Sequence, residues 1–284
     1  MKLQKQLRGI IMKFIIKFLS LLFATVTIIS CVGCKKSYLG AYIYFELPEI
    51  PKTLDPQTAS TDAELLIVKN IYEGLLSKNE NGSVICGVAE SFKIENSTYT
   101  FKLRENAVWS NGDKITADDF VFGFRRAVSP ETSAPFVSRL FCISGAEDIY
   151  NKKASPESLA VTAVDDTTLE ITLLREDGEF ENTLTTSVAM PCNEKFFYAS
   201  TGKYGLGSDY IISNGSYRLT KWNKEVFGIR LYKNNTYSGT LSANNAAVFL
   251  TCSDDETNLE KLKKSSIDIS FIDSSQTDNA KKSD

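Results

Sequence analysis

The stretch from Tyr99 to Pro130 constrains the fold of this chain more than any other, because local rules specify a strand and then a turn within it. Aromatic or apolar residues alternate with polar ones at its start, which is the pattern of a strand with one buried face. Asn111 and Gly112 both tolerate a positive φ, so they predict a tight turn after Trp109. The next element in the stretch is expected to be a helix.

That helix is predicted to begin at Ala117. The hydroxyl of Thr116 can cap the amide of Asp119, and the carboxylates of Asp118 and Asp119 lie at the positive end of the helix dipole. An apolar face follows, formed by Phe120, Val121, Phe124 and Val128. Pro130 ends the helix, since proline cannot continue it. None of these residues predicts a catalytic or ligand-binding function.

Three other segments carry patterns of regular structure. Residues 41–47 are apolar and aromatic, as expected of a strand buried in a sheet. Thr61 and Glu64 form a capping box that predicts a helix running to about Leu76. Residues 161–173 contain two apolar runs around an Asp-Asp pair and predict a hairpin.

The first thirty residues differ from the rest of the chain. Their only charges are five basic side chains, and an uncharged apolar run from Phe18 to Ser30 follows. That run is short for a membrane span and has the layout of a signal peptide. We therefore expect residues 1–30 to be a lipoprotein signal peptide, with an uncleaved signal anchor as the alternative. Met12 begins a more compact signal, so the start at Met1 or Met12 stays open.

A lipid attachment site is predicted at Cys31. The residues Ile28-Ile29-Ser30 before it resemble a lipobox, in which the cysteine is acylated and becomes the new N-terminus. Cys34 is the alternative site. If it were acylated, Cys31 would stand at the position where such signals have an aliphatic residue. Two acyl chains hold a protein firmly on a membrane. The chain is thus expected to be exported and lipid-anchored on the extracytoplasmic face, with residues 31–37 as a tether.

Charge and cysteine spacing exclude some classes of ligand. Without the five basic residues of the signal, 27 of the 32 basic side chains remain against 35 acidic ones, and an acidic exported protein is a poor nucleic-acid binder. The other cysteines fit no zinc pattern and are expected to be buried thiols, with one or two disulfides as the alternative. They are Cys86, Cys142, Cys192 and Cys252. No metal and no cofactor are expected.

Catalysis is not expected either. The chain has no histidine, which removes Ser-His-Asp and Cys-His schemes and the usual imidazole general base. The sequence has no phosphate loop of the GxxxxGK[ST] type. The adjacent carboxylate pairs all sit at predicted caps or turns, so no glycosidase-like pair stands out. A secreted hydrolase is the distant alternative.

Five segments, taken together, resemble a known family. They are LDPQTASTDAELLIVKNIYEGLL at 54–76, GVAES at 87–91, RENAVWSNGDKITADDFVFGFRRAVSP at 104–130, VTAVDDTTLEITL at 161–173 and NGSY at 214–217. This order of segments is similar to that of the peptide-binding proteins of bacterial ABC importers. Those proteins form extracellular solute-binding protein family 5, which includes oligopeptide- and dipeptide-binding lipoproteins.

The resemblance implies an α/β fold of the periplasmic-binding-protein type (class II, cluster C): a mixed-sheet lobe with an inserted subdomain. The implied ranges are 38–75 and 191–238 for the main sheet of the first lobe, 76–190 for the inserted subdomain, and 239–284 for the start of a second lobe. Because family members continue through a large second lobe, we expect that lobe to be largely missing and the chain to be C-terminally truncated.

The resemblance also implies ligand contacts. Ser60 and Asp62 fall in the first ligand loop, Phe136 matches an aromatic residue that lines the ligand site, and Asn214 matches a polar anchor at the cleft. Read without the resemblance, Asp55 and Asp62 are turn and cap residues, and Asn214 is part of a turn dipeptide.

The implied function is capture of peptides outside the membrane and their delivery to an ABC permease and its ATPase subunits, by a monomer without cofactor. The alternative is a truncated paralogue that no longer binds peptide and acts as a surface lipoprotein, or is a degraded gene fragment.

Overall fold

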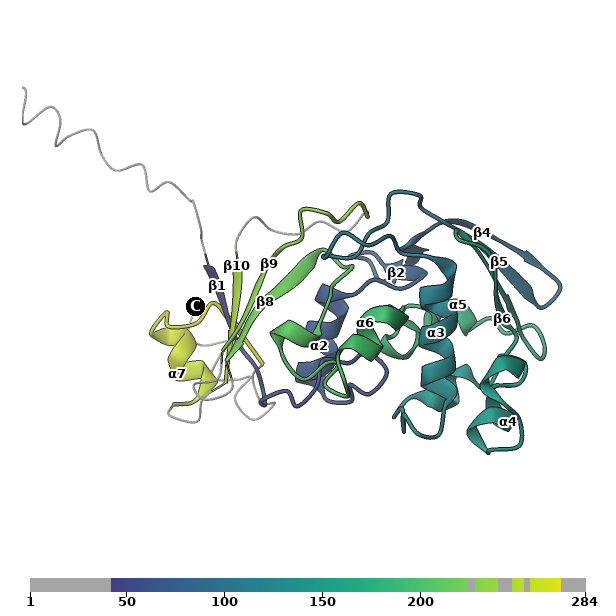
Figure 1. Cartoon of the computed structure of the whole chain (residues 1–284). Helices are drawn as coiled ribbons and strands as arrows, with labels where there is room; N and C mark the ends of the chain where they lie inside the picture. The colour runs from purple at the N-terminus through teal and green to yellow at the C-terminus, as the bar shows by residue number, and fades with distance from the viewer. Residues whose placement is uncertain (1–41, 224–227, 240–246, 253–255, 272–284) are drawn as a thin grey trace, which may run out of the picture. The chain divides into compact units, whose positions relative to one another are not determined.

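A computed structural model of the chain describes residues 42–223, 228–239, 247–252 and 256–271. The predicted signal peptide, the tether and Cys31 lie outside these residues. Figure 1 shows the elements along the chain.

The described elements form three sheets and several short helices. The strands are β1 (Tyr42–Glu46), β2 (Leu76–Lys78), β3 (Val84–Cys86), β4 (Ala89–Glu95), β5 (Thr98–Leu103), β6 (Val161–Asp165), β7 (Thr168–Thr172), β8 (Tyr217–Asn223), β9 (Gly228–Lys233), β10 (Ala247–Thr251) and β11 (Ile269–Ser270). The α-helices are α2 (Asp62–Ile71), α3 (Ala117–Val128), α4 (Ala146–Tyr150), α5 (Phe180–Thr183), α6 (Glu194–Ala199) and α7 (Asn258–Lys263). The 3₁₀ helices are η1 (Val137–Leu140), η2 (Pro156–Ser158), η3 (Ser187–Ala189) and η4 (Ser208–Tyr210).

The main sheet has five strands in the order β11-β1-β10-β9-β8. β1 is parallel to both of its neighbours, β10 and β11, whereas β9 is antiparallel to β10 and β8. The sequence assigned residues 239–284 to the start of a second lobe. The two strands described there, β10 and β11, both pair directly with β1. The pairing joins residues about 200 positions apart, so no local pattern announces it.

One face of β1 remains accessible. Its side chains alternate, and Tyr42 and Tyr44 are 41% and 40% exposed, whereas Ile43 and Phe45 face α2 across a groove. The expectation of a buried strand was therefore wrong at Tyr42 and Tyr44, whereas Glu46 on the same face is only 2% exposed. An aromatic run without polar alternation does not reveal which face a helix will cover.

The helix α2 begins as predicted and ends earlier than predicted. Thr61 and Glu64 form the expected capping box. The last carbonyl of the helix, that of Ile71, accepts the backbone N–H groups of Asn214 and Gly215 at 3.1 and 2.9 Å. The chain then turns extended at Tyr72. A distant segment thus takes the acceptor that another helical turn would need, and the predicted end at Leu76 was too late.

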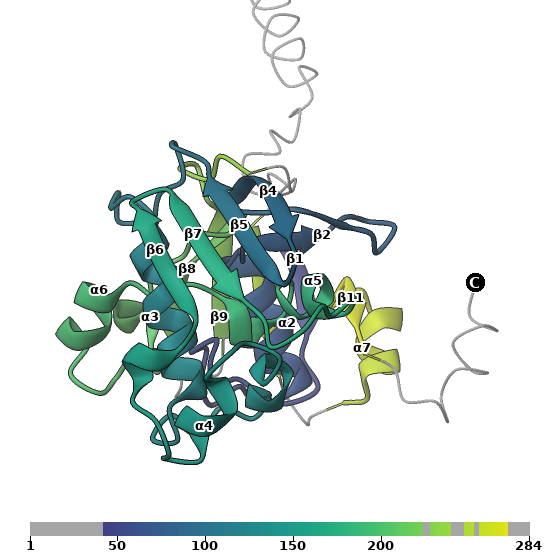
Figure 2. The ribbon, with the colours of Figure 1, turned by 90° about the vertical axis from the view of Figure 1, so that its right-hand side faces the viewer.

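The stretch from Tyr99 to Pro130 folds as its sequence predicts. β5 buries Tyr99, Phe101 and Leu103, Gly112 takes a φ of +92° in the turn, and α3 spans Ala117–Val128. β5 is an inner strand of the four-stranded antiparallel sheet β4-β5-β7-β6, seen face-on in Figure 2, where β6 and β7 form the predicted hairpin.

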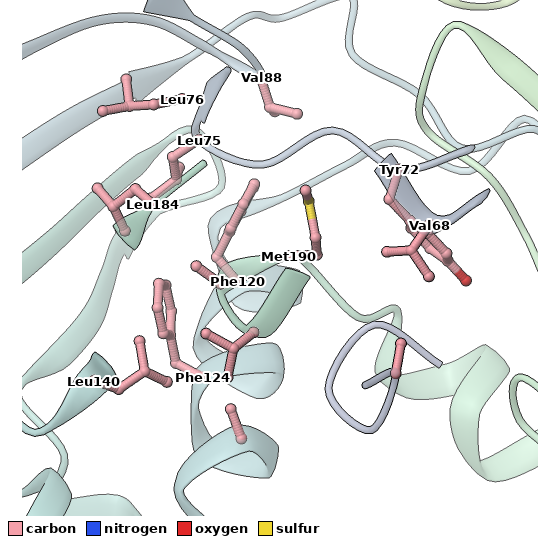
Figure 3. Packing of buried hydrophobic residues seen from close by; sticks show 14 of the residues in the cluster. Val68, Tyr72, Leu75, Leu76, Val88, Phe120, Phe124, Leu140, Leu184 and Met190 are labelled. Atoms are coloured by element: carbon pink, nitrogen blue, oxygen red, sulfur yellow. The ribbon is translucent and has the colours of Figure 1, made fainter. Parts of the chain in front are cut away.

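A continuous apolar core connects α3 with α2. Figure 3 shows Phe120 and Phe124 of α3 beside Leu140, Leu184 and Met190, with Val68 of α2 and Tyr72, the residue after α2, nearby. All seven side chains belong to one buried cluster. The core therefore fixes α2 and the segment that ends at Met190 relative to α3, and these elements enclose the cavity described next.

Candidate functional site

A cavity of about 270 Å³ opens where α2 meets the segments around η1 and η3. Leu65, Val68, Phe136 and Met190 supply apolar walls. Polar groups complete the lining: Lys69, Arg139, Thr185, Thr186 and Ser187. No lining residue is acidic. Ligand sites are commonly concave and mostly apolar with a few polar groups, and this cavity has that composition.

Hydrogen bonds to backbone carbonyls hold the walls of the cavity together. The side-chain amide of Gln57 donates to the carbonyl of Met190 at 2.9 Å, and the amide of Cys192 donates to the carbonyl of Asp119 at 2.9 Å. α3 can approach this segment because residue 123 is glycine: a Cβ there would lie 2.6 Å from the Met190 oxygen. The cavity is therefore a product of close backbone packing.

An ion pair supports the same wall from behind. The guanidinium of Arg126 donates to Asp55 at 2.7 Å and to the side-chain oxygen of Gln57 at 2.7 Å. Its planar face lies 4.1 Å from the ring centroid of Phe197, at cation–π distance. The chain Arg126–Gln57–Met190 thus links α3 to the cavity. Asp55 does serve a turn, accepting from the amide of Gln57, but sequence reasoning missed its ionic partner.

Buried titratable groups near this pair stay neutral. Burial raises the pKa of the Cys192 thiol to about 12, although the nearby Arg126 opposes this shift. Burial also raises the pKa of Tyr72 and of Tyr204, whose hydroxyls lie 3.3 Å apart. These groups therefore serve packing and hydrogen bonding at neutral pH.

The structure separates the four predicted contact residues. Phe136 lines the cavity. Ser60 and Asp62 are exposed at the N-terminal end of α2 and are not part of its lining; the amide of Ser60 donates to Glu64 at 2.9 Å. Their role in ligand binding stays a prediction.

Asn214 is buried and bonded to the backbone, and its role as a polar anchor at the cleft stays a prediction. It is only 3% exposed. Its side-chain oxygen accepts from the amide of Glu73 at 3.1 Å, and its side-chain nitrogen donates to the Glu73 carbonyl at 2.8 Å. Both ends of the amide are thus bonded to the backbone of Glu73. Its function is to hold the segment after α2 against the start of β8.

Sequence reasoning missed the polar residues of the cavity. Lys69 follows Leu65 by four positions on α2, so a helical wheel places both on one face. Arg139 lies three residues after Phe136. Both spacings are readable in the sequence, but they do not show that the two cations face one cavity. Thr185, Thr186 and Ser187 carry no local signal.

Among residues 42–223, 228–239, 247–252 and 256–271, no group of three or more His, Cys, Asp or Glu side chains is arranged to hold a metal ion. Within the same residues, none of the helices combines the length and apolarity needed to cross a membrane.

Comparison with known proteins shows which family this chain resembles. The family described as bacterial extracellular solute-binding proteins, family 5 Middle, matches residues 83–284. The dipeptide-binding protein of Lactococcus lactis is 28% identical over 246 residues, which is 84% of this chain and 45% of the relative. The periplasmic murein peptide-binding protein MppA of Escherichia coli is 37% identical over 172 residues, 60% of this chain and 32% of the relative.

Solved structures agree with the sequence comparison. Peptide-bound OppA of Listeria monocytogenes superposes with a TM-score of 0.75 at 30% identity, over 81% of this chain and 46% of that one. The chain spans 32% to 46% of the length of these relatives. The periplasmic-binding-protein fold class and the mixed-sheet architecture expected from the sequence are both confirmed. The chain therefore belongs to the bacterial extracellular solute-binding proteins of family 5.

Proposed function

We propose that this chain acts as a solute-binding lipoprotein of an ABC importer, capturing peptides outside the membrane for a permease and its ATPase subunits. Its family membership supports a transport role, and its relatives include a dipeptide-binding protein and a peptide-bound OppA. The observation that carries the proposal for this chain is the cavity itself. It combines an apolar wall that contains Phe136 with a polar rim that can meet a peptide backbone.

Peptide capture is tested by thermal unfolding of the purified full chain, with and without a pool of di- to pentapeptides. A ligand that binds the native state raises the midpoint by mass action, so a peptide-dependent rise is expected. Cooperative unfolding without any rise would favour the alternative, a surface lipoprotein that does not bind peptide by itself.

Phe136 is tested by substitution. Phe136→Ala removes an apolar wall of the cavity and is expected to weaken peptide binding, measured by calorimetry. Tyr198→Ala is the matched control, because Tyr198 is an aromatic residue that is 64% exposed and outside the cavity lining. Unchanged affinity in a Phe136→Ala chain that still unfolds cooperatively would remove Phe136 from the site.

Membrane attachment is proposed to run through acylation of Cys31 after removal of residues 1–30. The supporting features are the basic start, the uncharged apolar run and the lipobox-like residues before the cysteine. Labelling with radioactive palmitate in a bacterial host tests this. Cys31→Ala should abolish the label and Cys34→Ala should retain it, whereas the opposite result would move the site to Cys34.

The protein is proposed to act as a monomer without cofactor and without turnover of its ligand. The absence of histidine from the whole sequence supports the lack of turnover, since the common imidazole-based hydrolytic schemes cannot be built. Incubation with panels of peptides and glycosides tests the hydrolase alternative, and release of any product would support it.

A further inference from the structure

The cavity between α2 and η1 carries an unbalanced charge. Lys69 and Arg139 line it, and no lining residue is acidic. Both residues are exposed, so their charged ends are accessible to a ligand. The chain as a whole has the opposite balance, with a formal net charge of −3. A local concentration of positive charge in an acidic protein attracts anions toward that site.

These two cations differ from the buried cations of the protein. Arg104, Arg126 and Lys261 each lie 2.6 to 2.7 Å from a buried carboxylate. Within the part of the chain that the structure describes, neither Lys69 nor Arg139 has a carboxylate oxygen within 4.0 Å. Their donors are therefore available for an anionic group from outside the chain.

The rim also offers acceptors. The hydroxyl of Thr185 donates to the carbonyl of Asn182 at 2.8 Å, and that of Thr186 donates to the carbonyl of Thr183 at 2.6 Å. With their protons used internally, both hydroxyls present lone pairs to a ligand. An N–H group next to a carboxylate would find an acceptor and a cation in the same cavity. A peptide has both groups close together.

The volume limits what part of a ligand can enter. About 270 Å³ is slightly below the roughly 300 to 1,000 Å³ of sites that enclose a drug-sized molecule. The cavity therefore accommodates one portion of an extended ligand, such as a side chain or a chain end, against the apolar wall of Phe136.

We propose that this cavity selects a carboxylate-bearing portion of the ligand, with Lys69 and Arg139 as the specificity-determining residues. The proposal rests on the proposed peptide-binding function and names its substrate class: peptides with a carboxylate that enters here. The carboxylate has two sources, an acidic side chain or the peptide's own carboxyl terminus, and the experiment separates them.

The first arm uses small probes that fill only the cavity. N-acetylglutamate α-amide carries a side-chain carboxylate, N-acetylalanine carries a main-chain carboxylate, and N-acetylglutamine amide is the neutral match. Binding to the full chain is followed by ligand-detected NMR titration. At least one charged probe is expected to bind about tenfold more tightly than the neutral one, the gain expected of one charge-assisted hydrogen bond. Equal binding of all three, or no binding, overturns the proposal.

The second arm removes the charge and keeps most of the volume. Lys69→Met and Arg139→Met should each abolish the preference for the charged probe. Lys195→Met and Arg175→Met are the matched controls, since both residues are exposed and neither lines the cavity. A preference that persists in both cavity variants, or is lost equally in the controls, overturns the assignment to these two residues.

The third arm separates this inference from the proposed function. Calorimetry compares Ala-Glu-Ala, Ala-Gln-Ala and the C-terminal amide of Ala-Gln-Ala on the same chain. If no tripeptide binds while the small probes keep their charge preference, the cavity assignment stands and peptide capture fails. If the three tripeptides bind equally, peptide capture stands and the carboxylate selectivity is overturned.

Discussion

The guanidinium of Arg126 on α3 lies 2.7 Å from the carboxylate of Asp55, 71 residues earlier in the chain. The side chains of Arg126 and Asp55 are 10% and 7% exposed. A carboxylate and a guanidinium are thus buried together at the junction of α3 with the loop before α2. Each charge depends on the other, because an isolated buried charge is strongly unfavourable.

Arg126→Met should destabilise the protein by about 3 to 5 kcal/mol, the usual cost of removing one partner of a buried ion pair. The measurement is the free energy of unfolding in urea. Arg175→Met serves as control, since substitution of an exposed arginine should change that free energy by less than about 0.5 kcal/mol. Similar midpoints for both variants would show that Asp55 finds another partner or becomes protonated.

Stability should depend on pH through Asp119. This carboxyl accepts from the indole N–H of Trp109 and the amide of Thr116, both at 3.0 Å, but burial raises its pKa from 3.8 to about 6. The folded state therefore holds the proton more tightly than the unfolded state. The contribution of Asp119 to stability is complete below its unfolded pKa and declines as pH rises through about 6.

Asp119→Asn removes this titration. The stability advantage of the wild type over this variant should be larger at about pH 4 than at about pH 7, with a difference of at most about 3 kcal/mol. Urea unfolding of both proteins at each pH provides the measurement, and effects of other titrating groups cancel in the difference. If the difference in unfolding free energy between the wild type and Asp119→Asn stays constant or widens as pH rises, the raised pKa of Asp119 is contradicted.

Asn214→Ala tests the structural role of this asparagine. The substitution leaves the amide and the carbonyl of Glu73 without their partner in a buried region, which should cost about 1 to 3 kcal/mol for each unsatisfied group. Asn151→Ala at an exposed position is the control. Chemical denaturation compares the two, and a marginal effect at position 214 would mean that water replaces the lost side chain.

Two glycines offer a matched comparison. Gly205 and Gly112 have φ values of +77° and +92°, so alanine strains both backbones by about 1 to 2 kcal/mol. A Cβ at 205 would also lie 2.4 Å from the amide nitrogen of Asp55, whereas a Cβ at 112 meets nothing within 4 Å. Gly205→Ala should therefore lower the melting temperature clearly more than Gly112→Ala. Equal shifts would show that the loop at Asp55 yields easily.

Local elements were predictable wherever consecutive residues decide the outcome. The turn before α3 needs a residue that tolerates positive φ, and Gly112 provides it. The helix needs a cap and an apolar face, and both lie within Thr116 to Val128. The β6–β7 hairpin follows in the same way from alternation around two aspartates. In each case the interacting groups are neighbours in the chain, so the sequence alone determines the structure.

Tertiary structure decided everything that depends on a distant partner. In the sequence Asn214 belongs to a turn dipeptide, and only the fold shows that both ends of its amide bind the backbone of Glu73. β10 and β11 pair with β1, which lies about 200 residues earlier in the chain, and no local pattern indicates this pairing. The cavity joins Lys69 of α2 to Arg139 of η1, a juxtaposition created by packing of the core between them. Sequence patterns specify which groups a chain offers, but burial and long-range hydrogen bonds determine which of those groups remain available to a ligand.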